Sequence, residues 1–375
     1  METRSAIVCG VNWMQGKKRF LGWIFLAALM AVTGGILFRE QSMGLLWESL
    51  RQVKFPFVMG GLGLMLGYVG CEALCTRQIL GRLGHKTPYG RCLGYSFVGF
   101  YVSSITPSAT GGQPAQIYCM SRDRIPAAHG ALNMMLIAAC YQIATLLWGG
   151  SIWLFLPGRK AFRGGMGLLL LYGSVMMALL TIGMCMVMFM PGLSRRICEG
   201  VLKLLEKLRI LRSPASAREK LERQLAEYAR GAACIKENPG LALRVLALCV
   251  IQLGMLFSVP WMVYHAFGLQ GCSWIQIVGL QALLTLAVSN LPLPGAVGPA
   301  EGGFVSAFVT VFGVEMVTPA MLVSRGISFY AFLLISFAVS LAVHARLRRQ
   351  AEDRVRRKQE RVIPEKQAGV MRRYL

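Results

Sequence analysis

Charged residues and histidines are scarce in this sequence. Only 15% of its 375 residues are Asp, Glu, Lys or Arg, against about 25% in an ordinary soluble domain, and only four are histidine. The common catalytic signatures are also missing: there is no P-loop, no G-x-S-x-G and no H-E-x-x-H. The largest polar stretch, 193–240, is at the lower limit of domain size. These absences exclude the usual soluble enzyme domains and give no reason to expect a metal or another cofactor.

Cysteine spacing excludes two further classes of protein. The 11 cysteines are odd in number and none are spaced as C-x-x-C. Several, such as Cys71, Cys140 and Cys249, lie inside long apolar runs. A disulfide framework or a zinc site needs other spacing. We therefore interpret the cysteines as small hydrophobic residues.

Apolar residues are what the sequence has in excess. They make up 55% of the chain, and the mean hydropathy is +0.53. Runs of roughly 20 residues match a hydrocarbon core of about 30 Å. The sequence therefore predicts an all-α integral membrane protein, a polytopic helical bundle. The predicted spans are 20–38, 55–76, 131–157, 166–191, 241–267 and 319–343. The first run is longer than a signal-peptide core of about 7–15 residues, so we expect an uncleaved anchor.

The positive charge, +23 overall, lies mostly just outside these runs. Lys17, Lys18 and Arg19 precede the first run, which by the positive-inside rule places the N-terminus in the cytoplasm. The segment 193–240 has eleven basic against six acidic residues, and 344–375 has eleven against four. Both are predicted to be cytoplasmic. A short basic loop between the spans 131–157 and 166–191 falls outside in this scheme and violates the rule locally.

The stretch 93–120 does not read as a simple span. Pro107, Pro114 and the glycine pair Gly111-Gly112 interrupt it, and no continuous helix passes through such a segment. Each arm has about a dozen residues, or roughly 18 Å of helix, too short to cross the core. Both flanks are basic. We therefore predict a re-entrant hairpin that opens to the cytoplasm.

The stretch 274–313 is broken in a similar way between Leu291 and Gly303. By helix counting, the preceding span ends outside and the last span must reach the basic tail inside. This second re-entrant hairpin therefore opens outward. Two broken hairpins that enter from opposite faces are typical of an inverted repeat with a binding site near the midplane.

The sequence divides into four parts. A first membrane half, 1–192, is followed by a basic amphipathic cytoplasmic segment, 193–240, divided near Pro214. A second membrane half, 241–343, precedes a basic cytoplasmic tail, 344–375. Two alternatives remain for the central segment: it binds an anionic lipid surface, or it is a solvated linker.

The two breaks are the candidate site. Irregular backbone inside a bilayer must be buried in protein or line a wet cavity, and the N-termini of the returning half-helices favour an anion such as phosphate. A structural kink is the alternative. The candidate substrate-binding residues are Thr106, Pro107, Gly111, Gly112, Gln113, Pro114, Pro294, Gly298, Glu301, Gly302 and Arg325.

Three ionisable residues lie within or near the apolar runs. Glu301 and Arg325 would each cost about 2.5–3.5 kcal/mol if unpaired at a helix centre. We expect them to pair with each other or to contact a headgroup. Glu72 lies closer to a cytoplasmic end, so we expect its side chain to snorkel to the interface.

The two hairpins resemble the transmembrane region of the lysylphosphatidylglycerol synthases, also called the flippase-like domain of the multiple peptide resistance factor. The matching stretches are 103–107, 111–118, 292–295 with Gly298, 301–303, and Arg325 followed by Phe329-Tyr330. The likeness extends over essentially the whole chain in the order of segments. A glutamate is common in such families near the first Gly-Gly, where this chain has Gln113. A charged role at the first hairpin is therefore not implied.

The resemblance implies a flippase-like lipid transporter in the bacterial cytoplasmic membrane, acting on an aminoacyl-phosphatidylglycerol or another envelope lipid. The full-length synthases add a soluble domain that transfers lysine to phosphatidylglycerol, and here only a short basic tail follows His344. A membrane-embedded lysyl- or glycosyltransferase is the alternative, as is a partner subunit of a separate synthase. The expected partners are membrane phospholipid, an anionic lipid surface and a separate synthase or a second copy of the chain, with no nucleic acid.

Overall fold

A computed structural model describes residues 51, 53–106, 109–155, 165–207, 214–289, 291 and 298–371. Every regular element in these ranges is a helix. The chain is therefore an all-α membrane protein, as predicted from its composition. The first predicted span, 20–38, and the basic loop after 131–157 lie outside the described residues.

Five helical stretches are long and apolar enough to cross a membrane, within the described ranges. They are α3 (Phe55–Arg82), α6 (Ala127–Phe155), α7 (Gly165–Phe189), the pair α10 (Pro239–Phe257) and α11 (Val259–Ala266), and a long stretch that begins with α13 (Pro299–Arg325). Proline occupies the first turn of α3, α10, α11 and α13, where its missing N–H costs no helical hydrogen bond. The protein is an integral membrane protein.

The first predicted hairpin consists of two short helices. They are α4 (Tyr89–Ser104), with 16 residues, and α5 (Gly112–Arg122), with 11 residues. They pack against each other, and α4 also packs against α3. At 1.5 Å per residue they are about 24 Å and about 17 Å long, both shorter than a hydrocarbon core of about 30 Å. The face from which this hairpin enters stays a prediction.

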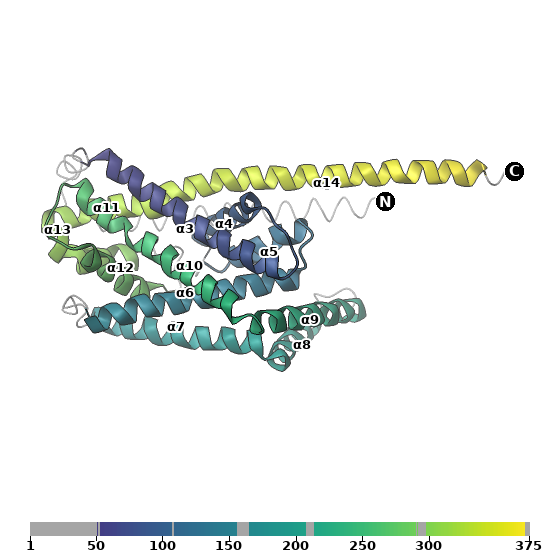
Figure 1. Cartoon of the computed structure of the whole chain (residues 1–375), viewed down its shortest axis with the longest axis horizontal. Coiled ribbons are helices and arrows are strands. Elements are labelled where there is room, and N and C mark those ends of the chain that lie inside the picture. The colour runs from purple at the N-terminus through teal and green to yellow at the C-terminus, as the bar shows by residue number, and fades with distance from the viewer. Residues whose placement is uncertain are drawn as a thin grey trace.

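The second predicted hairpin pairs α12 (Trp274–Val288) with α13, and the two helices pack against each other. Non-helical φ and ψ angles of 77° and 164° at Gly313 break α13 near the predicted end of the hairpin. Beyond Gly313 the chain runs on through a π-helical turn, η4 (Gly326–Ala331), into α14 (Phe332–Met371). Helical backbone therefore continues through the predicted last span and most of the predicted tail (Figure 1).

The basic central segment forms two helices, α8 (Pro191–Lys207) and α9 (Pro214–Lys236). They lie at the end of the bundle beyond which α14 extends (Figure 1). α9 packs against α6, and a Cβ atom at Gly231 would come within 2.5 Å of Cδ1 of Leu132. The second half of the segment is therefore docked on the bundle and is not a solvated linker.

Candidate functional site

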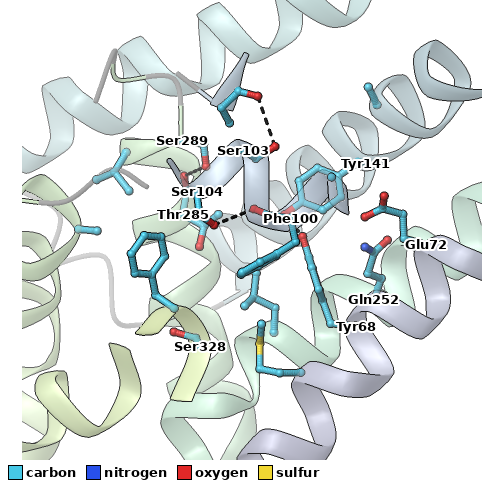
Figure 2. A pocket seen from close by; sticks show the side chains of 18 of the residues that line it. Tyr68, Glu72, Phe100, Ser103, Ser104, Tyr141, Gln252, Thr285, Ser289 and Ser328 are labelled. Carbon is cyan, nitrogen blue, oxygen red and sulfur yellow. Dashed lines mark hydrogen bonds between the residues drawn. The ribbon is translucent and has the colours of Figure 1, made fainter. Parts of the chain in front are cut away.

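A cavity of about 530 Å³ opens between the two hairpins. Figure 2 shows Glu72 and Gln252 on one side of it, with Ser289 and Ser328 on the opposite side. The polar lining residues come from several helices: Tyr68 and Glu72 (α3), Ser103, Ser104, Gln113 and Gln116 (α4 and α5), Tyr141 and Gln142 (α6), Gln252 (α10), and Gln281, Thr285, Ser289, Ser324, Arg325 and Ser328 (from α12 to η4). The two stretches that prolines and glycines interrupt, 93–120 and 274–313, therefore line the same cavity.

A buried ion pair joins Glu301 of the second hairpin to Arg325 at the edge of this cavity. Nε of Arg325 donates to Oε1 of Glu301 over 2.8 Å, and the backbone N–H of Gly298 donates to Oε2 over 2.6 Å. The Glu301 side chain is only 2% exposed. Gly298 has φ +95°, a conformation that residues with a Cβ atom rarely adopt. Glu301 therefore caps the helix that it begins and fixes the guanidinium of Arg325.

Arg325 lies at the end of α13, directly before the π-helical turn. Its guanidinium carbon is 5.2 Å from the ring centroid of Phe329, within the range of a cation–π contact. π-helical turns are rare and occur often at functional sites. Arg325 and Phe329 both line the cavity. This end of the cavity combines a fixed positive charge with an aromatic face.

The first hairpin is closed by hydroxyl and glycine contacts instead of charges. Oγ1 of Thr106 donates to the carbonyl of Val102 over 2.8 Å and accepts the N–H of Gly111 over 3.1 Å. A Cβ atom at Gly112 would come within 1.9 Å of Oγ of Ser103, so α4 and α5 approach too closely for any other residue. Thr106, Gly111 and Gly112 shape the turn and do not line the cavity, whereas Ser103 does line it.

The remaining predicted residues are placed as follows. Gln113 lines the cavity, and Pro114 lies exposed in the first turn of α5. Gly302 is exposed, with open space where a Cβ atom would be, and it does not line the cavity. Its neighbour Gly303 is closely packed instead, because a Cβ atom at Gly303 would lie 2.6 Å from Cδ1 of Leu284. Pro107 and Pro294 lie outside the described residues.

The expectation for Glu72 is wrong. Its side chain does not reach out to the interface but lines the cavity, where Nε2 of Gln116 donates to Oε1 of Glu72 over 2.8 Å. The physical reason is that α5 folds back against the bundle and offers a hydrogen-bond donor at that depth. A Cβ atom at Gly99 would come within 2.0 Å of Nε2 of Gln116, so a glycine on α4 makes room for this contact.

Sequence reasoning also missed the amides and phenols of the cavity. Gln142, Gln252 and Gln281 all line it, and the hydroxyl of Tyr68 lies 3.4 Å from that of Tyr141. A signal for them was present, because glutamine is uncommon inside apolar spans and polar residues there usually face a protein interior. Their presence adds hydrogen-bonding groups to a cavity that apolar side chains also line.

No cluster of three or more His, Cys, Asp or Glu side chains suited to a metal occurs among the residues that the structure describes. Among the lining residues that the structure describes, Glu72 supplies a carboxyl group and Arg325 a guanidinium group. What the site offers is hydrogen bonding and charge recognition in a cavity of ligand size.

Comparisons with known proteins agree with this architecture. The family model of the lysylphosphatidylglycerol synthase TM region matches residues 19–336, which include both hairpins and the cavity. A search of curated proteins found no match. On the strength of that long match, the chain belongs to the lysylphosphatidylglycerol synthase TM-region family.

Proposed function

We propose that this protein is a flippase-like transporter in the bacterial cytoplasmic membrane that moves a phospholipid or another envelope lipid by taking its headgroup into the cavity between the hairpins. The observation that carries the proposal is that both hairpins and Arg325 line one cavity of about 530 Å³. Ligand sites of about 300–1,000 Å³ are usual for small molecules. The N- and C-termini are assigned to the cytoplasm by the basic segments.

Arg325 is the residue we assign to the headgroup phosphate. A guanidinium presents a planar fork of donors that matches phosphate, and Glu301 already holds one edge of it in place. The serine and threonine hydroxyls of α12 and η4 and the amide of Gln113 surround the same space. A fixed cation inside a polar cavity attracts an anionic headgroup away from the membrane surface.

The test is headgroup translocation in proteoliposomes, normalised to protein that elutes as a folded species. Arg325→Lys keeps the charge but loses the fork, so we expect about a tenfold loss of rate. The double change Glu301→Gln with Arg325→Gln removes both charges without leaving either unpaired. We expect it to fold and to stay inactive.

Arg348→Gln is the matched control, because Arg348 is a solvent-exposed arginine that pairs with Glu352 on α14, away from the cavity. A double variant with normal rates would reduce the ion pair to a structural role and overturn the assignment of Arg325. A new lipid species in the mass spectrum would favour a transferase. Activity only on addition of a separate synthase would favour a partner subunit.

A further inference from the structure

The side of the cavity formed by α3, α5 and α10 is rich in hydrogen-bond acceptors. Gln252 and Gln116 are 1% and 6% exposed, and both line the cavity. Their side-chain oxygens are buried and have no hydrogen-bond partner in the part of the chain that the structure describes, and the same is true of Gln281. The carboxylate of Glu72 adds further acceptor sites on the same side (Figure 2).

The orientation of Gln116 is fixed by its neighbour. Its Nε2 donates to Oε1 of Glu72 over 2.8 Å, which turns its Oε1 away from that contact. When the carboxyl group of Glu72 is ionised it only accepts, and reversing the amide would then place oxygen against oxygen. The unsatisfied acceptor at Gln116 is therefore a consequence of the hydrogen bond to Glu72.

The carboxyl group of Glu72 has no cationic partner among the described residues. Arg325 is the one positively charged lining residue in the described ranges, and Glu301 already pairs with it at 2.8 Å. Within those ranges no Lys, Arg or His forms an ion pair with Glu72, whose hydrogen bond comes from a neutral amide. A carboxyl group at membrane depth without a cationic partner is either protonated or compensated by a bound cation.

We propose that Glu72, Gln116 and Gln252 form a binding site for a monovalent cation. Buried acceptors without donors are satisfied by a group that only donates or by an ion that takes oxygen ligands, and one positive charge matches the one carboxyl group when that group is ionised. The ligand chemistry fits an ammonium group, as on a lipid headgroup, or a free alkali ion. This site is distinct from the Arg325 end of the cavity; a free ion there goes beyond the proposed lipid transport, and a headgroup amine there rests on it.

The test measures binding by thermal unfolding of the purified full chain in nanodiscs of phosphatidylglycerol, a lipid without an amine. Sodium, potassium or methylammonium chloride replaces N-methyl-D-glucamine chloride at constant ionic strength. At least one of the three small cations should raise the unfolding midpoint in a saturable way, because a ligand that binds the folded state stabilises it. Glu72→Gln, which can still accept the Gln116 hydrogen bond, should weaken the apparent affinity about tenfold.

Glu315→Gln is the matched control, since Glu315 is an exposed carboxylate on α13 outside the cavity lining. It should bind the cation as the unchanged protein does. If Glu72→Gln does not fold, Gln252→Met removes one acceptor with little change of shape and should weaken binding about threefold.

The responses to the different cations distinguish a headgroup amine from a free alkali ion as the ligand. A response to methylammonium but not to sodium or potassium assigns the site to a headgroup amine, and a response to an alkali ion assigns it to a free ion. The absence of any saturable shift, or an equal shift in Glu72→Gln and the unchanged protein, would overturn the proposal. Translocation of phosphatidylglycerol that depends on Arg325 would stand in either case, so the two proposals fail independently.

Discussion

The two hairpins look alike in sequence, yet the structure stabilises them by different means. In the first, Thr106 and Gly112 close the turn through a hydroxyl and through close backbone approach. In the second, Glu301 caps its own helix and pairs with Arg325. A break made by proline and glycine therefore fixes where a helix ends, but not what holds the broken backbone in place. One turn depends on shape and the other on charge.

The largest effect expected from this difference is at the second hairpin. Glu301→Ala leaves Arg325 largely buried without its carboxylate, and we expect a loss of about 3 kcal/mol in the free energy of unfolding. Unfolding of the detergent-solubilised protein by increasing denaturant measures it. Glu72→Gln is the comparison, because it keeps a neutral hydrogen-bond partner, and it should cost less than about 1 kcal/mol. Equal losses at both positions would show that the ion pair with Arg325 contributes no more than one neutral hydrogen bond.

Close packing should give the next largest effect, at the first hairpin. Gly112→Ala places a Cβ atom 1.9 Å from Oγ of Ser103 and 2.7 Å from the carbonyl oxygen of Gly99. Because the second neighbour is backbone, we expect a loss of about 1–3 kcal/mol in the same unfolding measurement. Gly302→Ala, in the first turn of α13, meets open space and should be neutral or slightly stabilising. A neutral Gly112→Ala would contradict the close approach of α4 and α5.

A smaller effect is expected at the turn hydroxyl. Thr106→Val keeps the shape of the side chain but removes the oxygen that accepts the N–H of Gly111 and donates to Val102. We expect a loss of about 1 kcal/mol, the usual net contribution of one hydrogen bond. Ser306→Ala serves as control, since that exposed hydroxyl on α13 donates to the carbonyl of Gly302 within its own helix. A loss no larger than that of the control would show that the Thr106 hydroxyl does not stabilise the turn.

The last comparison concerns the faces from which the hairpins enter, and it involves no change in stability. Cys272 precedes α12 in a loop predicted to be outside, whereas Cys234 lies on α9 in the segment predicted to be cytoplasmic, and both side chains are partly exposed. In single-cysteine variants, a membrane-impermeant maleimide added to intact cells should label Cys272 and spare Cys234. Labelling of Cys234 would invert the predicted orientation.

The sequence by itself determined the class of protein and the positions of its breaks. Long apolar runs require helices in a bilayer, because hydrocarbon offers the backbone no hydrogen-bond partners. Proline and glycine end helices locally, which is why α4, α5, α12 and α13 begin or end close to the predicted breaks. The sequence also indicated that Glu301 and Arg325 lie at membrane depth, because both have apolar neighbours along the chain.

Tertiary structure alone decided which residues meet in the cavity. Glu72 and Gln116 are 44 positions apart, and no local pattern shows that α5 folds back to meet α3. The same holds for Gly302 and Gly303, which are equivalent in sequence but differ in whether a neighbouring helix lies against them. Local propensity depends on neighbours along the chain, whereas the partner of a polar group at membrane depth depends on how whole helices pack.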